Sequence, residues 1–411
     1  MDESSLFAKG SEHRWLKQLT HSQTRGAEAA RRIVEFRRDM HQHPEIGMDT
    51  ARAADKIEAF LQTLPVEQVH RFAGNGVCAV IRGKKDGPMI GLRADTDALP
   101  IQEETSVAWK SAIDKCAHLC GHDGHTAGLL AAATLLAQTR DFAGSVVLIF
   151  QPGEEGWAGA DKMIKDGLFE RYPCREVFAI HGAPSRPLGT VAVREGAMTA
   201  SVDIAYMTVE GRGGHGARPQ ETIDPMPAAA ELILALQTIV ARNINPADSA
   251  VVSCCFVQAG DPLAPTVIPQ RVNLSATIRT HSPKVRDKIE ARFNEITQGI
   301  GTVFGGEVKL DYQRRYPPQI NDPALVRAIL PALQSVYGEA GVDTKFAPSM
   351  GGEDFAYYLE KLPGAFMFLS SSNPAKGTDV SHHNPKFDVD EDVLWEGSAV
   401  FVAIVEEFLN K

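Results

Sequence analysis

Apolar and polar positions repeat with a helical period in some segments of this chain and gather into short apolar runs in others. The helical period predicts helices over residues 26–38, 50–64 and 124–138. The apolar runs predict strands over residues 76–82, 89–93, 146–150, 177–180 and 365–369. Because strands that alternate with helices form parallel sheets covered on both faces, we expect an α/β fold in which helices sandwich a mainly parallel sheet.

The pattern changes in the middle of the chain. Alternating segments predict strands over residues 202–209, 251–257, 272–278 and 307–312, with helices over residues 225–242 and 283–300. The order β-α-β-β-α-β is that of a ferredoxin-like α+β unit. Since candidate site residues lie on both sides of it, we predict an insertion. Residues 1–199 and 313–411 then form the catalytic domain, and residues 200–312 form the inserted domain.

Length and composition agree with a soluble protein of two domains. The chain has 411 residues, of which 44% are hydrophobic and 23% charged. A net charge of −10 argues against a nucleic-acid partner, which needs a basic surface. Six cysteines without disulfide-framework spacing favour a reducing compartment. With no apolar segment that reads as a signal peptide or a membrane span, we expect a cytoplasmic protein.

The densest group of candidate ligands is Cys120-Gly121-His122-Asp123-Gly124-His125, with His118 just upstream. A thiolate beside imidazole is the ligand set that Zn²⁺ and similar ions favour, and the two glycines allow a tight turn. A disulfide partner, or a buried inert cysteine with surface histidines, would explain the same residues. The local evidence favours a metal site over these alternatives without deciding between them.

Four predicted strands lead into acidic or imidazole groups. These groups are Asp95 with Asp97, Glu154 with Glu155, His181, and His382 with His383. Singly, each has a plainer explanation, such as turn chemistry or a solvated acidic loop. In an open α/β sheet, however, ligands gather at the carboxyl ends of the strands. Convergence on one edge, together with the Cys120 turn, favours a metal-dependent enzyme. His41 and His43 are placed in a loop after the first helix, where no metal role is required of them.

With these residues the chain resembles the metallopeptidase family of carboxypeptidase G and aminoacylase. The nearest branch contains hippurate hydrolases, aminobenzoyl-glutamate hydrolases and plant auxin–amino-acid conjugate hydrolases. The resemblance spans nearly the whole chain and is carried by five motifs in order, at residues 93–100, 120–125, 150–155, 213–217 and 353–355. It implies a zinc-exopeptidase-like catalytic domain with two metal ions, and an inserted lid or dimerisation domain.

The resemblance also implies roles for single residues. The implied metal ligands are Cys120 as the bridge, His122 and His181 at one ion, and Glu155 and His383 at the other. Glu154 is implied to be the general base, Asp97 to support the ligands without binding metal, and Asp95 to lie beside the site. Zn²⁺ is the first expectation for the two ions, with Mn²⁺, Co²⁺ and Ni²⁺ as alternatives.

Substrate contacts are implied for the inserted domain and for the last motif. The resemblance implies that His215 of a partner subunit stabilises the oxyanion. It also implies that Arg279 binds the free carboxylate of the substrate. It also places Thr266, Gly351 and Gly352 at the substrate. On local evidence alone, a tight turn with an incidental histidine and a solvated arginine are the alternatives. Thr266 stands where the family commonly has Asn, and Gly182-Ala183 replaces a bulkier pair, which bears on substrate choice.

With this resemblance, the sequence predicts a metal-dependent amidohydrolase that forms a homodimer or a higher homo-oligomer through the inserted domain. It would cleave the amide bond of N-acyl amino acids, or of related small amides with a free carboxylate, by a metal-activated water with Glu154 as general base. A dipeptidase or carboxypeptidase on the same scaffold is the nearest rival. A non-catalytic metal-binding homologue is a second rival, and a hydrolase that uses the Cys120 thiol, whose activity would survive chelation, is a third.

Overall fold

The structure is a computed structural model that describes residues 25–410. The described chain divides into two compact units. The first contains residues 25–196, 321–347 and 357–410, and the second contains residues 197–320 and 348–356. The assignment of these units as a catalytic and a lid domain stays a prediction here. Among the described residues, no helix is both long and apolar enough to cross a membrane.

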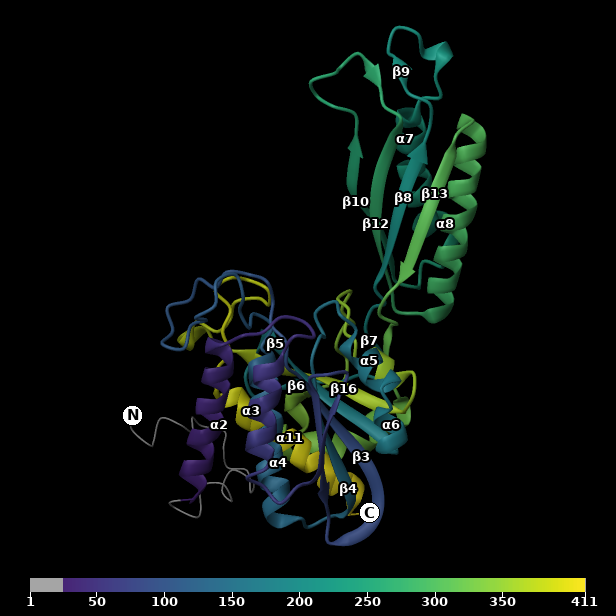
Figure 1. Cartoon of the computed structure of the whole chain (residues 1–411). Coiled ribbons are helices and arrows are strands. Elements are labelled where there is room, and N and C mark those ends of the chain that lie inside the picture. Colours follow the sequence, from purple (N-terminus) through teal and green to yellow (C-terminus); the bar gives the residue numbers. More distant parts are fainter. Residues whose placement is uncertain (1–24, 411) are drawn as a thin grey trace. The chain divides into compact units, whose positions relative to one another are not determined.

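An eight-stranded sheet runs through the first unit in the order β1-β2-β4-β3-β5-β16-β6-β15 (Figure 1). Its strands are β1 (Glu67–Phe72), β2 (Gly76–Arg82), β3 (Lys85–Asp95), β4 (Ala143–Gln151), β5 (Glu176–Pro187), β6 (Val191–Ala192), β15 (Val342–Asp343) and β16 (Gly364–Ser372). The neighbours β4, β3, β5 and β16 are mutually parallel, whereas β1 and β2 pair antiparallel at one edge. The prediction of a mainly parallel α/β sheet is confirmed.

Helices cover both faces of this sheet. They are α2 (Arg25–Gln42), α3 (Ala51–Leu61), α4 (His122–Thr139), α5 (Gly159–Lys165), α6 (Leu168–Arg171), α9 (Pro323–Tyr337), α10 (Ala356–Leu359) and α11 (Asp392–Leu409). The main core forms between one sheet face and α2, α3, α4, α9 and α11, while α5 packs on β4 from the other face. Helix α4 is rich in Ala, Leu and Gly and is buried on nearly every side, as expected of a helix that is apolar all round. Its first turn is therefore fixed against the core.

Two boundary predictions are wrong near the candidate ligands. Helix α2 continues through His41 to Gln42, so His41 lies in the last helical turn and not in a loop. A proline restricts only the residue before it, and the helix can therefore persist until just short of Pro44. Strand β5 does not end at His181, because its parallel pairing with β16 continues as far as Pro187.

The second unit has a four-stranded antiparallel sheet in the order β10-β12-β8-β13. Its strands are β8 (Asp203–Glu210), β10 (Ala250–Ala259), β12 (Arg271–Thr280) and β13 (Glu307–Arg314). Helices α7 (Pro225–Thr238) and α8 (Pro283–Phe304) pack on one face around a separate core. The predicted ferredoxin-like order is confirmed. Two small ribbons complete the fold, formed by β9 (Gly214–His215) with β11 (Val267–Ile268) and by β7 (Gly196–Thr199) with β14 (Gln319–Asn321).

Candidate metal centre

The candidate ligands of the first unit meet at the carboxyl edge of the parallel strands. Asp95 ends β3, Glu154 and Glu155 follow β4, and His181 lies within β5. Cys120 and His122 come from the turn that begins α4, where Gly121 has a left-handed φ of 89°. A residue other than Gly would be strained in that conformation. The predicted convergence of separate strand ends with the Cys120 turn is therefore present in the fold.

Ligand atoms of the five predicted metal residues lie close together. Cys120 Sγ is 3.5 Å from His181 Nε2. Glu155 Oε1 is 3.3 Å from His383 Nε2 and 3.9 Å from His122 Nε2. Cys120, Glu155 and His383 each offer one ligand atom, and these three atoms lie within 4.8 Å of one another. His122, Glu154 and Glu155 form a second group by the same measure. The donors are thus grouped at the spacing that shared metal ions require.

A hydrogen bond orients the ring of His181, and an ion-pair contact orients the ring of His122. His181 Nδ1 donates to the carbonyl of Gly182 over 2.8 Å, and His122 Nδ1 lies 3.5 Å from Asp97 Oδ1. Metal-binding histidines are usually oriented in this way by a carbonyl or carboxylate on the nitrogen that does not bind. The Nε2 atoms of both rings remain directed at the centre.

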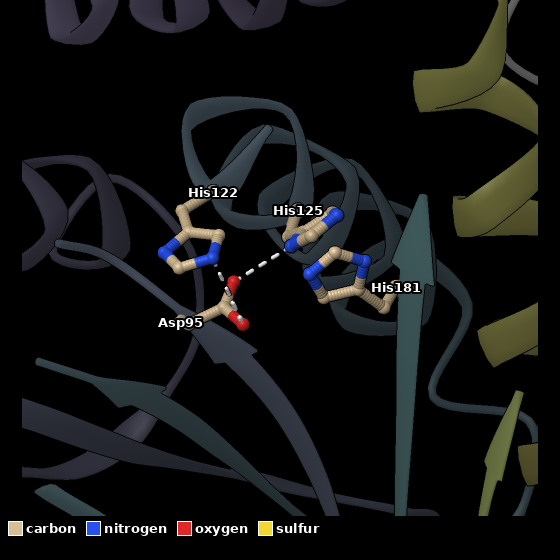
Figure 2. Close-up of side chains that lie close together, drawn as sticks. All are labelled: Asp95, His122, His125 and His181. Carbon is tan, nitrogen blue, oxygen red and sulfur yellow. Dashed lines mark hydrogen bonds and ion pairs between the residues drawn. The ribbon is translucent and has the colours of Figure 1, made fainter. Parts of the chain in front are cut away.

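His125 is the member of the Cys-His cluster whose local pattern was ambiguous, and its contacts exclude it as a ligand. Its Nδ1 lies 2.7 Å from Asp95 Oδ1, and its Nε2 accepts a hydrogen bond from the backbone N–H of Gly182. Figure 2 shows Asp95 between the rings of His122 and His125, with His181 beside them. Both nitrogens of His125 are used, so its role is to orient Asp95.

The two aspartates after β3 have different partners. Asp97 accepts backbone hydrogen bonds from Glu154 and Glu155 at 2.9 and 3.1 Å. Asp95 is held by Arg93 Nη1 at 2.8 Å. Asp97 therefore fixes the backbone of the glutamate pair as well as facing His122. Sequence reasoning missed that Arg93 and His125 both bind Asp95, because the local pattern of neither residue identifies its partner.

The protein's own charges shift the pKa values of the candidate ligands. Burial by itself lowers the pKa of His122, but the carboxylates of Asp95 and Asp97 more than offset this effect and the pKa rises to about 10. Burial raises the pKa of the Cys120 thiol well above its usual range, and nearby glutamates raise it further. A thiolate at Cys120, whether as nucleophile or as ligand, therefore needs a neighbouring cation to stabilise it.

The donor set fits divalent metal ions. Among the described residues, His122 Nε2 and Glu155 Oε1 are buried atoms without a hydrogen-bond partner, which is unusual for buried polar groups. The thiol, imidazole and carboxylate donors suit Zn²⁺ and its transition-metal neighbours. A cation at this point would also neutralise the carboxylates that crowd it.

Two further histidines of the sequence motifs, buried His118 and half-buried His382, lie outside the ligand groups. Burial lowers the pKa of His118 to about 3, and its ring centroid lies 6.3 Å from that of His41. Burial and neighbouring histidines likewise lower the pKa of His382 to about 3. Of the adjacent pair, His383 is the one whose Nε2 contacts Glu155.

The predicted residues of the second unit fall at two separate places within it. His215 is exposed in β9, where Val267 of β11 pairs with it, and the carbonyl of neighbouring Thr266 accepts the N–H of Gly216. Arg279 lies near the far end of β12, where a Cβ added to Gly352 would come 3.5 Å from its Nη1. Gly351 accepts a backbone hydrogen bond from Ala200. His215 and Thr266 therefore lie together, and Arg279 lies with the two glycines.

Comparison with known proteins agrees with this geometry. The model of Peptidase family M20/M25/M40 matches residues 91–407. The chain belongs to this family. It is 37% identical to the N-acetylcysteine deacetylase of Bacillus subtilis over 91% of this chain and 96% of that protein. It is 34% identical to the hippurate hydrolase of Campylobacter jejuni, over 92% and 96% of the two chains.

A solved relative extends the agreement to three dimensions. The Bacillus subtilis YXEP protein, a dinuclear metal-binding peptidase of the M20 family, superposes with a TM-score of 0.81 at 33% identity. The match covers 94% of this chain and 99% of that one. An IAA-amino acid hydrolase of Arabidopsis thaliana is 35% identical over 99% of this chain. The amidohydrolase branch named from the motifs is thereby confirmed.

Proposed function

We propose that this protein hydrolyses the amide bond of N-acyl amino acids, or of related small amides with a free carboxylate, with two divalent metal ions. The observation that carries the proposal is the convergence of the five donors beside Glu154 at one sheet edge. The named relatives that act on N-acetylcysteine, hippurate and IAA–amino acid conjugates support the same class of substrate. Zn²⁺ is the first candidate for the ions. Six free cysteines agree with a reducing, cytoplasmic location.

Glu154 is the residue to which we assign proton transfer. When bound, the metal ions supply Lewis-acid chemistry, polarising the amide carbonyl and acidifying a water. The side chain of Glu154 is 6% exposed, and Asp97 fixes its backbone. A carboxylate held there can take the proton of the attacking water and pass it to the nitrogen of the leaving amine.

Arg279 is the group we assign to the free carboxylate of the substrate. Within the described part of the second unit, no salt bridge joins it to a carboxylate, and its Nε donates to Thr277 Oγ1 over 3.2 Å. Partial burial lowers its pKa. A guanidinium that is partly desolvated and without a carboxylate partner is suited to bind an anionic ligand.

A substrate panel tests the proposal. Metal-loaded protein is expected to cleave N-acyl amino acids faster than their carboxamides. Arg279→Met is expected to raise KM for the free acids roughly 10–100-fold, the value of a charge-assisted hydrogen bond, and to remove the preference. Arg314→Met is the matched control, because Arg314 is already paired with Asp287 and Glu290. Faster cleavage of dipeptides would favour the dipeptidase, and no preference for the free carboxylate would contradict the role of Arg279.

We also propose that two subunits complete each site. His215 and Arg279 are separated by the length of β12, roughly 30 Å for a strand of this size. One copy of the second unit cannot bring both to one small substrate. The edge strand β10 supports a dimer, since Phe256 and Val257 are exposed on it and edge strands of this kind tend to pair.

Mixed dimers test this arrangement. His215→Ala and Glu154→Gln are each expected to be inactive as homodimers. Co-refolded or co-expressed together, they should regain activity, because one site of the mixed dimer then has both wild-type groups. A mixture that stays inactive while mixed dimers are demonstrated by mass spectrometry would show that His215 does not act across the interface.

A further inference from the structure

A second cluster of charged side chains adjoins the candidate metal centre, since its member Asp123 directly follows His122. The proposed reaction does not use this cluster. Arg37, His41, Glu103 and Asp123 are each at most 1% exposed, and Asp388 is 8% exposed. All belong to the first unit. Charges are rarely buried this completely unless they are paired. The ion pairs of the cluster therefore identify the chain segments that it connects.

Arg37 joins two segments that each carry proposed metal ligands. Its Nε lies 2.7 Å from Asp123 Oδ2, and Asp123 directly follows His122. Its Nη2 donates to Asp388 Oδ1, and Asp388 stands five residues after His383. The guanidinium therefore links the turn of Cys120 and His122 to the segment of His383.

His41 contacts the same oxygen of the Asp123 carboxylate as Arg37 does. His41 Nδ1 lies 2.9 Å from Asp123 Oδ2, and its Nε2 lies 3.3 Å from Glu103 Oε1. Glu103 is fixed in turn by the backbone N–H of Ser111. Because Arg37 and His41 are one turn apart on α2, a single rigid helix presents both groups to Asp123.

Packing brings the two linked segments into direct contact. A Cβ added to Gly121 would lie 3.3 Å from Val389 Cγ2, and one added to Gly124 would lie 3.6 Å from Val389 Cγ1. A backbone hydrogen bond from the N–H of His383 to the carbonyl of Leu119, over 2.8 Å, also joins the two segments beside the proposed ligands. Arg37 adds charged, directional contacts to this link, because it pairs with Asp123 and Asp388 and its Nη1 lies 3.7 Å from Glu391 Oε1.

Burial of these charges is weak evidence for a purely stabilising role. Apolar residues of similar volume often serve stability as well as a buried ion pair does, whereas charged groups can specify a single arrangement. We propose that Arg37 is a positioning residue of the metal centre. It fixes the position and orientation of Cys120 and His122 relative to His383, and thereby determines the affinity for both metal ions. This inference rests on the proposed di-metal function.

The test measures metal binding by the full-length protein. The apoprotein is titrated with Co²⁺, and binding is monitored by the visible absorption spectrum of the bound Co²⁺. Arg37→Met is expected to weaken Co²⁺ binding about 10–100-fold, as is typical when the residue that orients a ligand is lost. Asp388→Asn removes the Asp388 charge from the link to the His383 segment and leaves the Arg37–Asp123 pair and the longer Arg37–Glu391 contact in place. It is expected to weaken the binding of one ion and to leave the other near its wild-type affinity.

Arg286→Met is the matched control. Arg286 makes a buried bidentate pair with Asp203 in the second unit, so its loss also leaves a buried carboxylate unpaired but should not change the Co²⁺ titration. If Arg37→Met does not fold, Arg37→Lys and Asp388→Asn decide the question. Unchanged Co²⁺ affinity in those folded variants, or an equal loss in Arg286→Met, would overturn the inference. Wild-type protein that binds no Co²⁺ would instead overturn the proposed function.

Discussion

Replacement of Glu154 by Gln is expected to lower kcat about 10²–10⁴-fold, the usual contribution of a general acid–base group. The amide has nearly the shape of the carboxylate but cannot accept a proton at neutral pH. Asp97 bonds to the backbone N–H of Glu154, which the substitution keeps, so the loop should keep its position. Steady-state kinetics on an N-acyl amino acid, together with metal content per subunit, would measure the effect.

Glu170→Gln provides the control for this variant. Glu170 is an exposed residue of α6 and should tolerate the change with unaltered kinetics. Two metal ions bound to an inactive Glu154→Gln protein would support proton transfer as its role. Activity within a few-fold of wild type would show that another group is the base, and loss of metal from the variant would reassign Glu154 as a ligand.

Removal of metal is expected to abolish hydrolysis and to lower the unfolding temperature, and added Zn²⁺, Mn²⁺ or Co²⁺ should restore both. An ion that binds only the native state adds about 2.7 kcal/mol to the free energy of unfolding at a concentration of 100 Kd. Two ions would therefore make a large contribution. Chelation, dialysis and reconstitution, with activity and thermal unfolding measured at each stage, would test this expectation.

Cys120→Ala should reproduce the effect of chelation in the presence of metal. Cys120 Sγ lies next to His181 Nε2, and its loss removes the donor to which we assign the bridge between the ions. Cys255→Ala is the control, since Cys255 is an exposed thiol of β10 in the second unit. Hydrolysis that persists in chelator and disappears only in Cys120→Ala would favour the thiol nucleophile.

Most of the fold could be predicted from short segments, because hydrophobic periodicity and turn-forming residues are local properties of the sequence. The strand predicted over residues 76–82 coincides with β2, and the β-α-β-β-α-β order of the second unit followed from strands and helices each recognisable alone. The parallel strands also placed Asp95, Glu154 and His181 at one edge, because parallel strands share their carboxyl ends. The amidohydrolase branch followed from motifs that are contiguous in the chain.

Local pattern fails where a residue's environment comes from distant segments. The sequence marked His125 as a possible ligand, and only its bonds to Asp95 and to Gly182 show that both its nitrogens are occupied. His41 was predicted to lie in a loop without a partner, because Pro44 favours an earlier end of the helix and the contact with Asp123, 82 residues away, has no local signal. A prediction from short windows has no access to such a contact.

The sequence by itself determined the α/β class, the ferredoxin-like insertion and the family. Tertiary structure decided which imidazole nitrogens face the centre, and that His215, in the β9–β11 ribbon, and Arg279 lie near opposite ends of β12. It also decided that Arg37 pairs with Asp388, which lies 351 residues further along the chain. The physical reason is the range of the interactions. Secondary structure depends on neighbours along the chain, whereas ligand orientation and charge pairing depend on distances that exist only after the chain has folded.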